Sequence, residues 1–259
     1  MSQNVPLLSA NNISITFGGI KACSNVSFEV NEGEIVSIIG PNGAGKTTVF
    51  NLLTGVYQTE TGNIIFDNKD ISKFSPQKVV ESGIGRTFQN IRLFKNMRVI
   101  ENVLVGAHTH TKYSFIDSVF RTNKFKDEEN KNVIKSLEIL EKLKMIDKKD
   151  EYASNLPYGS QRKLEIARAI ATGAKLILLD EPAAGMNPNE TKELLEFIRG
   201  IRDLGLTILL IEHDMSFVMN LSDRVYVLNQ GKLISEGTPE KVANDPEVIK
   251  AYLGGEVLC

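Results

Sequence analysis

The sequence has little cysteine and no tryptophan. Its two cysteines, Cys23 and Cys259, lie near opposite ends of the 259 residues. Neither has a CxxC neighbour or the spacing of a metal-ligand cluster, so neither a disulfide framework nor a zinc site is indicated. We expect both thiols to be free and without a role.

Long apolar runs are also missing. The longest of them, such as residues 207–211, are far shorter than the roughly 20 residues that a membrane-spanning helix needs. The N-terminal MSQNVP has no signal-peptide character. We therefore expect the chain to stay in the cytoplasm.

A surplus of positive charge is absent as well. The formal net charge is −2 and the pI is about 6.0. Such a chain has no basic excess with which to neutralise a nucleic-acid backbone or an anionic bilayer. We expect no nucleic-acid partner.

What remains is the composition of an ordinary globular protein, with a change of pattern along the chain. Short strands are predicted in the first third, and residues 91–170 favour helices. The helical pattern is clearest where Val133, Leu137 and Leu140 recur among charged residues. The strands predicted in this first third are 7–17, 26–30, 35–39 and 62–67.

The last third alternates between strand and helix. Two all-apolar strands, 176–179 and 207–211, flank a helical segment at 189–203. This order predicts an α/β fold whose parallel sheet carries helices on both faces. The chain then returns to strands at 224–228 and 232–236 and ends in a helical region at 239–253.

A phosphate-binding loop is predicted at residues 40–48, which read GPNGAGKTT. The loop satisfies G-x-x-x-x-G-K-[ST] and lies between the strand IVSII and an apolar helix start, as this motif requires. Its glycines let successive N–H groups point at an anion, and the helix N-terminus adds partial positive charge. The expected nucleotide contacts are Gly40, Pro41, Asn42, Gly43, Ala44, Gly45, Lys46, Thr47 and Thr48.

Three side chains of this loop have distinct expected roles. Lys46 would bridge the β- and γ-phosphates, and the Thr47 hydroxyl would coordinate Mg²⁺. Thr48 would donate to the α-phosphate. The sequence therefore predicts a nucleotide phosphate chain and Mg²⁺ as the bound groups, and it gives no support for guanine specificity. Residues 68–71, NKDI, miss the guanine-reading N-K-x-D by one position.

Two adjacent carboxylates follow the apolar strand LILL. Asp180 at the end of that strand could hold Mg²⁺ through water, and Glu181 could deprotonate an attacking water. Paired acids can instead cap the next segment, but the upstream phosphate loop favours the catalytic interpretation.

The order of five motifs resembles the ATP-binding cassette (ABC) family: the phosphate loop, GRTFQN, LPYGSQ, LILLDEP and IEHD. The resemblance implies that the nucleotide is ATP and that Phe17 stacks on its adenine. It also implies that Gln89 contacts Mg²⁺ and the lytic water, and that His213 contacts the γ-phosphate and that water. Glu181, His213 and Gln89 are thus the expected catalytic residues.

The fold and domains implied by the resemblance agree with the strand and helix pattern. We expect one ABC ATPase domain over residues 1–259, with a P-loop core of mainly parallel sheet and an N-terminal antiparallel β subdomain. Residues 1–90 and 171–259 would form the core, and residues 91–170 an inserted helical subdomain.

The turn LPYGSQ, residues 156–161, stands where the family has Leu-Ser-Gly-Gly-Gln. By the resemblance it caps a helix whose N-terminus faces the γ-phosphate held by a second cassette. Gly159 permits close approach of the backbone, and we expect the helix to begin near Ser160. Gly159 and Ser160 are therefore further expected nucleotide contacts.

This turn departs from the family pattern. Pro157 stands at the family's serine position and has neither a hydroxyl nor an N–H. Tyr158 replaces a glycine, and Ser160 replaces the glutamine. Asn187 stands where the family commonly has Asp. The departures either weaken one of two ATP sites or are neutral because the helix end suffices, and the sequence leaves both alternatives open.

The nearly end-to-end likeness is to ATPase subunits of bacterial branched-chain amino acid importers. It implies a second ABC ATPase subunit, two membrane permease subunits and, indirectly, a substrate-binding protein outside the cell. The chain would lie peripherally on the inner face of the cell membrane. Alternatives are a cassette for urea, amides or another amino acid, a soluble non-transport ABC switch, and a kinase.

Overall fold

A small antiparallel sheet opens the chain. The computed structural model describes residues 5–111 and 113–253. Four strands form this sheet in the order β2-β1-β4-β5. Their bounds are β1 Leu8–Phe17, β2 Ile20–Val30, β4 Thr61–Phe66 and β5 Lys69–Asp70. Alternating burial along β1 shows that one face of the sheet packs inward.

A second, mainly parallel sheet forms the centre of the molecule, in the order β10-β9-β3-β8-β7-β6. Only the edge pair β10–β9 is antiparallel among its described strands. Every residue of β3, β7 and β8 is buried, as a sheet covered on both faces requires. The bounds are β3 Ile35–Ile39, β6 Ile84–Arg86, β7 Leu176–Asp180, β8 Thr207–Ile211, β9 Arg224–Asn229 and β10 Lys232–Gly237.

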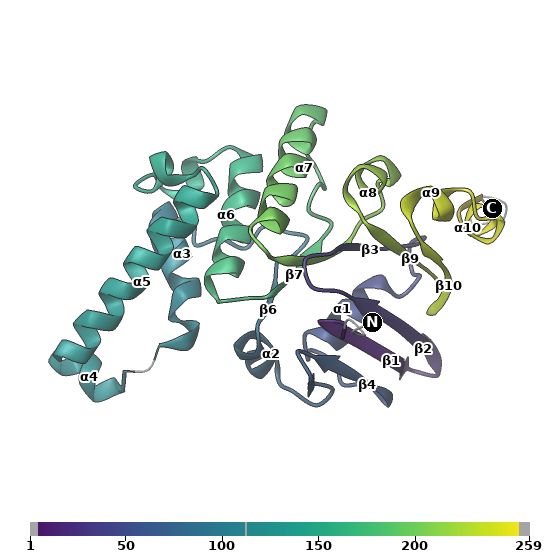
Figure 1. The fold of residues 1–259 in the computed structure, drawn as a ribbon, viewed down its shortest axis with the longest axis horizontal. Coiled ribbons are helices and arrows are strands. Elements are labelled where there is room, and N and C mark those ends of the chain that lie inside the picture. The colour runs from purple at the N-terminus through teal and green to yellow at the C-terminus, as the bar shows by residue number, and fades with distance from the viewer. Residues whose placement is uncertain (1–4, 112, 254–259) are drawn as a thin grey trace.

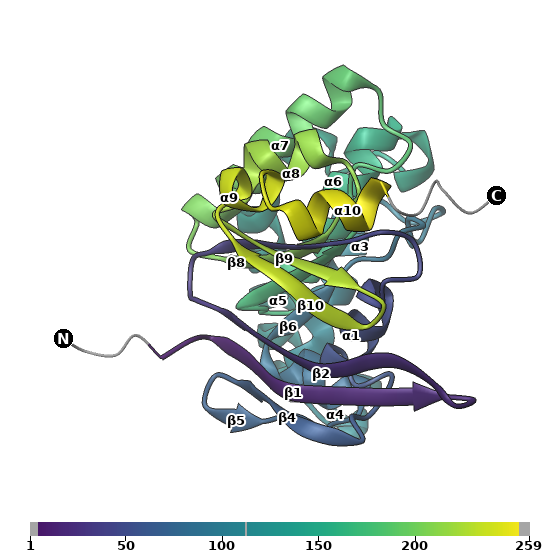
Figure 2. The same cartoon turned by 90° about the vertical axis from the view of Figure 1, so that its right-hand side faces the viewer.

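Apart from α1 and α2, which lie on the side of the antiparallel sheet, the α-helices form two groups (Figure 1). One group, α3 to α6, forms a separate cluster at the left of that view. The other includes α7 to α10, which lie on one side of the central sheet, opposite the antiparallel sheet (Figure 2). The α-helices are α1 Lys46–Leu53, α2 Pro76–Ser82, α3 Val99–Ala107, α4 Phe115–Phe120, α5 Asn123–Lys142, α6 Tyr158–Ala171, α7 Pro188–Asp203, α8 Met215–Leu221, α9 Pro239–Ala243 and α10 Pro246–Leu253, and the 3₁₀ turns are η1 His108–His110, η2 Ile146–Lys148 and η3 Ala153–Asn155.

Two large apolar cores hold these layers together. The first lies between the antiparallel sheet, α1 and one face of the central sheet, and contains Phe50 and Phe66. The second lies between the other face and the helices, and contains Leu164, Leu194 and Phe217. Each fully buried side chain of this kind contributes about 1.5–3 kcal/mol. The central sheet is therefore fixed from both faces.

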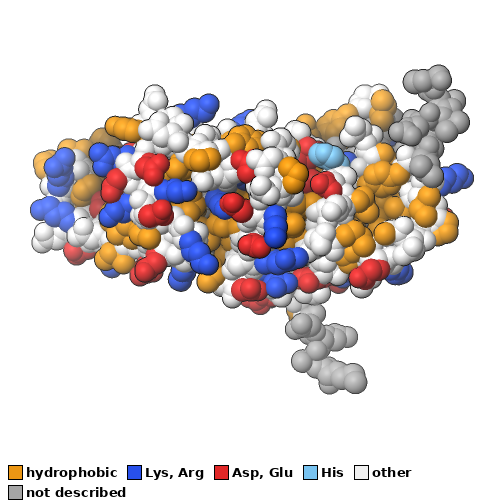
Figure 3. All heavy atoms as spheres, turned by 90° about the horizontal axis from the view of Figure 1, so that it is seen from above, with side chains coloured by type: hydrophobic (Ala, Val, Ile, Leu, Met, Phe, Trp, Pro, Cys, Tyr) orange, Lys and Arg blue, Asp and Glu red, His pale blue; other side chains and the backbone are white. Residues whose placement is uncertain are grey.

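The predicted fold class is confirmed: an antiparallel N-terminal sheet, a mainly parallel sheet and a helical insert. None of the helices in residues 5–111 and 113–253 is both long and apolar enough to cross a membrane. Charges of both signs intermingle with apolar side chains on the face seen in Figure 3.

Several boundaries differ from the prediction. The second strand begins at Ile20 rather than at residue 26. Its pairing with β1 continues through several irregularities as far as the pair Phe17 and Ile20, so the strand starts earlier than predicted. The short elements β6, α2 and α8 carry too few residues for a clear periodic pattern.

We call the turn LPYGSQ at residues 156–161 the signature turn and α6, the helix that continues from it, the signature helix. The start of this helix was predicted wrongly. The helix begins at Tyr158 rather than near Ser160, because Pro157 is its extended N-cap and the Pro157 carbonyl accepts from the Gln161 N–H at 2.9 Å. Proline suits this place, where a helix needs no N–H from its cap.

Cys23 gives the first testable prediction. Its side chain is buried in the first core, its Sγ donates to the Ile13 carbonyl at 3.3 Å, and burial raises the pKa of the thiol from 9.0 to about 11. Because the thiolate is the reactive species, iodoacetamide at pH 8 should leave Cys23 unmodified in the folded protein and alkylate it in urea. Peptide mass spectrometry measures both, and equal labelling in the two states would contradict the burial. Cys259 lies outside the described residues.

Candidate nucleotide site

The phosphate loop lies at the carboxyl end of β3 and leads into α1. Its tight path depends on glycine at two positions. A Cβ added at Gly40 would lie 2.1 Å from the Leu228 carbonyl oxygen, and one at Gly45 would lie 2.5 Å from that of Ala22. The φ values of these glycines are 150° and 101°, which other residues rarely adopt. The loop backbone therefore packs closely against β2 and β9, with no space for a side chain at these two positions.

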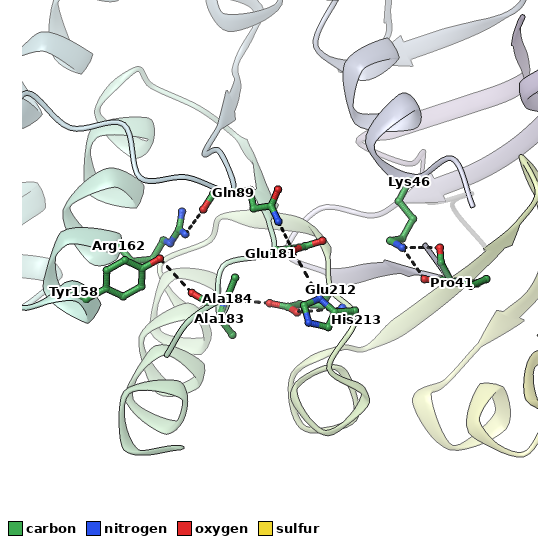
Figure 4. A network of polar contacts seen from close by, with 11 residues as sticks. Pro41, Lys46, Gln89, Tyr158, Arg162, Glu181, Ala183, Ala184, Glu212 and His213 are labelled. Carbon is green, nitrogen blue, oxygen red and sulfur yellow. Dashed lines mark hydrogen bonds and ion pairs between the residues drawn. The ribbon is translucent and has the colours of Figure 1, made fainter. Parts of the chain in front are cut away.

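Lys46 lies folded over this loop (Figure 4). Its Nζ donates to the carbonyl oxygens of Gly40 at 2.6 Å and Pro41 at 3.1 Å. Burial lowers the pKa of Lys46, and the nearby charges of Glu181 and Asp180 partly offset that effect. The ammonium is therefore held at the loop by carbonyl dipoles, where an anion would find it.

A cavity of about 460 Å³ opens over the loop. Backbone N–H groups and an ammonium suit phosphate oxygens, while a threonine hydroxyl and carboxylates suit Mg²⁺. The donors of this cavity therefore fit a nucleotide phosphate chain with its cation. Its lining residues are Ile20, Lys21, Ala22, Asn42, Gly43, Ala44, Gly45, Lys46, Thr47, Thr48, Glu181, Gln230 and Gly231.

Phe17 lies on the hairpin beside this cavity. It is 42% exposed, and it pairs in register with Ile20, which lines the cavity. Tyr57 contacts its ring edge-on, with centroids 5.0 Å apart. An exposed aromatic surface is thus available to a base, and Tyr57 is a second aromatic residue that the sequence did not indicate.

Asp180 makes an ion pair that the sequence did not predict. Its Oδ2 accepts from Arg86 at 2.9 Å, with both side chains 10% exposed. Arg86 also donates to the side chains of Asn51 on α1 and of Thr54, the residue that caps the C-terminus of α1. One guanidinium thus connects the helix after the phosphate loop with the carboxylate at the end of β7 and fixes the orientation of Asp180.

Glu181, Gln89 and His213 are brought together from three separate segments (Figure 4). The Gln89 Nε2 donates to Glu181 Oε2 at 2.8 Å, and the His213 Nδ1 lies 3.8 Å from the same oxygen. Glu181 has φ 45°, in the left-handed region that non-glycine residues rarely occupy. Its N–H donates to the Ile211 carbonyl at 3.0 Å, which helps to hold this conformation.

Glu212 is a buried carboxyl that sequence reasoning missed. It is 1% exposed, and its two oxygens accept from the N–H groups of Ala183 at 3.0 Å and His213 at 3.1 Å. Burial raises the pKa of Glu212, and these backbone donors oppose that shift without cancelling it. Glu212 thereby ties the segment after Glu181 to the segment that carries His213. Its position beside His213 in IEHD was the available signal.

The signature turn lies away from its own phosphate loop, on the other side of Glu181 in Figure 4. The Tyr158 hydroxyl donates to the Ala184 carbonyl at 3.2 Å, and the Ser160 Oγ accepts from Lys148 at 3.4 Å. Gly159 and Ser160 do not line the cavity over the loop. A nucleotide bound in that cavity would therefore not be lined by these two residues.

Asn187 has a local role in the fold. Its side chain accepts from the N–H groups of Asn189 and Glu190 at 3.0 Å each and so caps α7. The Glu190 carboxylate in turn accepts from the Asn187 N–H at 3.0 Å, which completes a capping box. Asparagine is among the best residues for this position. The departure at residue 187 therefore preserves the helix start.

The chain is similar to known transport proteins over nearly its full length. A family model described as ABC transporter matches residues 23–184, and one described as branched-chain amino acid ATP-binding cassette transporter matches residues 232–257. The high-affinity branched-chain amino acid transport ATP-binding protein LivG of Salmonella typhimurium is 48% identical, with 98% of this chain and 99% of that protein covered. BraF of Pseudomonas aeruginosa, named for the same transport, is 45% identical, with 96% and 98% covered.

Solved structures agree with the sequence comparisons. An ATP-binding cassette of an ABC transporter in its ADP conformation superimposes with a TM-score of 0.84 at 37% identity, with 96% of this chain and 99% of that chain covered. A nucleotide-free ATP-binding cassette gives 0.82 at 36% identity over the same shares.

Glu212 gives a prediction about pH. Because its pKa is raised in the folded state, its contribution to stability is full below the unfolded carboxyl pKa of about 4.3 and is lost as the pH rises through the folded pKa. In Glu212→Gln this loss should disappear, so urea unfolding should show the variant gaining stability relative to the wild type as the pH rises through that window.

The exposed Glu141 provides a matched control, and Glu141→Gln should leave the pH dependence unchanged. His213, whose Nδ1 lies 3.9 Å from Glu212 Oε2, is present in both the wild type and Glu212→Gln. A constant difference in unfolding free energy between Glu212→Gln and the wild type at every pH would contradict the prediction.

Proposed function

Since this chain belongs to the ABC transporter family, as one of its ATP-binding proteins, we propose that it energises uptake of Leu, Ile and Val by a bacterial importer. Members of this family hydrolyse ATP to drive transport, and that is the activity of this chain. The observation that supports the proposed substrates is the nearly full-length similarity to LivG and BraF, both named for branched-chain amino acid transport.

The geometry supports a division of roles in hydrolysis. The loop N–H groups and Lys46 bind the phosphates, with Thr48 at the α-phosphate and Phe17 against the adenine. Glu181 takes the proton of the attacking water, a role that contributes about 10²–10⁴-fold. Its carboxylate is oriented by the Gln89 amide at 2.8 Å. His213, whose side chain is 59% exposed, is free to turn its ring toward the γ-phosphate and the water.

Thr47, Gln89 and Asp180 are the residues that would hold Mg²⁺, which neutralises charge on the β- and γ-phosphates when bound. The chain's own contribution is to fix these three groups. Arg86 orients Asp180 through the bond at 2.9 Å. The Gln89 side chain points at Glu181 in Figure 4.

Two surfaces of the chain support the proposed partners. A second ABC ATPase subunit would bring its ATP to Gly159 and Ser160, which lie outside the cavity over this chain's own loop. Two membrane permease subunits would dock beside Gln89, where a cavity of about 580 Å³ is lined by Phe88, Arg92, Leu93, Phe94, Val105 and Arg168. The chain would then lie on the cytoplasmic face of the membrane, served indirectly by a substrate-binding protein.

This arrangement treats the chain as one ABC ATPase domain with residues 91–170 as its helical subdomain. ATP would close two such subunits and hydrolysis would reopen them, and the helical subdomain would pass the motion to the permeases.

Glu181→Gln tests the proposed base. A glutamine side-chain oxygen still accepts from Gln89 but takes up no proton, so ATP affinity should stay within about twofold while turnover falls at least about 100-fold. Fluorescent nucleotide titration and phosphate release measure the two quantities, with Glu141→Gln as the control. Turnover near the wild-type value in Glu181→Gln would remove Glu181 from this role.

The transport assignment is tested by isolating the tagged chain from gently solubilised native membranes. Mass spectrometry should find two polytopic membrane proteins and a second cassette. Vesicles containing that complex and its binding protein should accumulate labelled leucine, isoleucine and valine when ATP is inside. Accumulation of urea or an amide instead would overturn the substrates, and ribosomal or DNA-bound partners without membrane proteins would overturn transport.

A further inference from the structure

A fully buried ion pair lies on the signature helix α6. Arg162 is 0% exposed and Glu165 is 1% exposed, and their charged atoms are 2.8 Å apart. Arg162 is the largest of the fully buried side chains in the described parts of the chain. Arg162 lies about one helical turn, and Glu165 about two turns, after Tyr158, where the helix begins.

The pair grips the backbone of the loop that carries Gln89. Arg162 donates to the carbonyl oxygens of Phe88 at 2.6 Å and Gln89 at 2.7 Å. The second oxygen of Glu165 accepts from the Arg92 N–H at 3.0 Å. Three backbone groups within five residues are therefore held by one pair of side chains, and the bond to Gln89 is visible in Figure 4.

The loop itself has little regular structure. It runs between β6 and α3, and Gln89, Asn90 and Arg92 are exposed. An exposed irregular loop has many accessible conformations. Yet the Gln89 side chain lies 2.8 Å from Glu181 Oε2, a distance that depends on where the loop backbone is held.

A gain in folding stability does not explain why this ion pair is buried. Removing two charges from water costs several kcal/mol per ion, and apolar replacements of similar volume are often neutral or stabilising. The Nε of Arg162 is buried without a hydrogen-bond partner, which adds to that cost. What an apolar pair would not supply is a planar fork of donors that reaches two successive carbonyls.

We propose that Arg162 and Glu165 are positioning residues that set the distance between Gln89 and Glu181. Neither contacts the reacting groups, and both act through the backbone of residues 88–92. Because they lie on α6, a movement of the signature turn displaces the Gln89 loop with the helix. The Tyr158 bond to Ala184 places the same helix start against the segment after Glu181.

This role rests on the proposed function of Gln89 and Glu181. It adds that the signature helix of a chain controls the catalytic geometry of that same chain. Whatever contacts Gly159 and Ser160 would thereby affect the chain's own Gln89.

The decisive variant is the apolar pair Arg162→Met with Glu165→Leu. Its thermal midpoint should stay within a few degrees of the wild type and its ATP affinity within about twofold, while kcat falls at least about tenfold. Hydrogen exchange of the Arg92 amide should accelerate, because its acceptor is gone. Lys163→Met is the control on α6, since Lys163 pairs with Glu193, which is 67% exposed, and it should change none of these values.

The exchanged pair Arg162→Glu with Glu165→Arg separates the ion pair from the loop contacts. It keeps both charges on the helix but turns a carboxylate toward the carbonyls of Phe88 and Gln89, so it should be as slow as the apolar pair. Wild-type kcat in either double variant would overturn the proposal. Arg162→Lys, which keeps the charge but loses the fork, should be intermediate and serves if a double variant does not fold.

Hydrogen exchange does not depend on turnover, so it tests by itself whether the pair holds the backbone of residues 88–92. Unchanged exchange of the Arg92 amide in the apolar pair would show that the pair does not hold this loop and would overturn the proposal even if kcat fell. In all these tests kcat is measured on the complex with the second cassette and the permeases, and absence of ATP hydrolysis by the wild-type complex would count against the proposed function instead.

Discussion

The parallel register of β3, β8 and β7 is the constraint on which the site depends. Ile38 on β3 and Asp180 on β7 both pair with Ile211 on β8. Because parallel strands end at the same edge, the phosphate loop, the carboxylates after β7 and the histidine segment after β8 emerge side by side. The strands are buried on both faces, so apolar packing that involves no catalytic atom maintains this alignment.

At that edge, backbone groups carry much of the polar organisation. Glu181 is held by the Ile211 carbonyl, Glu212 accepts two N–H groups, and Lys46 is bound by two carbonyls of its own loop. Backbone groups move only with their strand or helix, so these side chains are preorganised with little entropy to lose. Asp180 is held instead by a side chain, through its ion pair with Arg86.

The signature helix α6 connects parts of the molecule that are far apart in sequence. Its first residue, Tyr158, contacts Ala184, and its second turn holds the loop of Gln89 through Arg162. The two residues that depart from the family pattern therefore have structural roles within this chain. Pro157 is the N-cap of the helix, and the Tyr158 hydroxyl donates to the Ala184 carbonyl. Side-chain changes there leave the helix N-terminus, with its free N–H groups, intact.

The sequence alone determined the fold class from the alternation of strands and helices, and it determined the phosphate loop and the candidates Asp180 and Glu181 because each depends on a short pattern whose spacing sets its geometry. His213 was indicated only by the resemblance to the ABC family. The sequence did not indicate Arg86, whose partner Asp180 is 94 residues away. Nor did it indicate Glu212 or the pair on α6, since a charged residue in a helix or after a strand is usually solvated. Only the packing of α6 against the loop at residues 88–92 removes water from Arg162 and leaves backbone carbonyls as its partners.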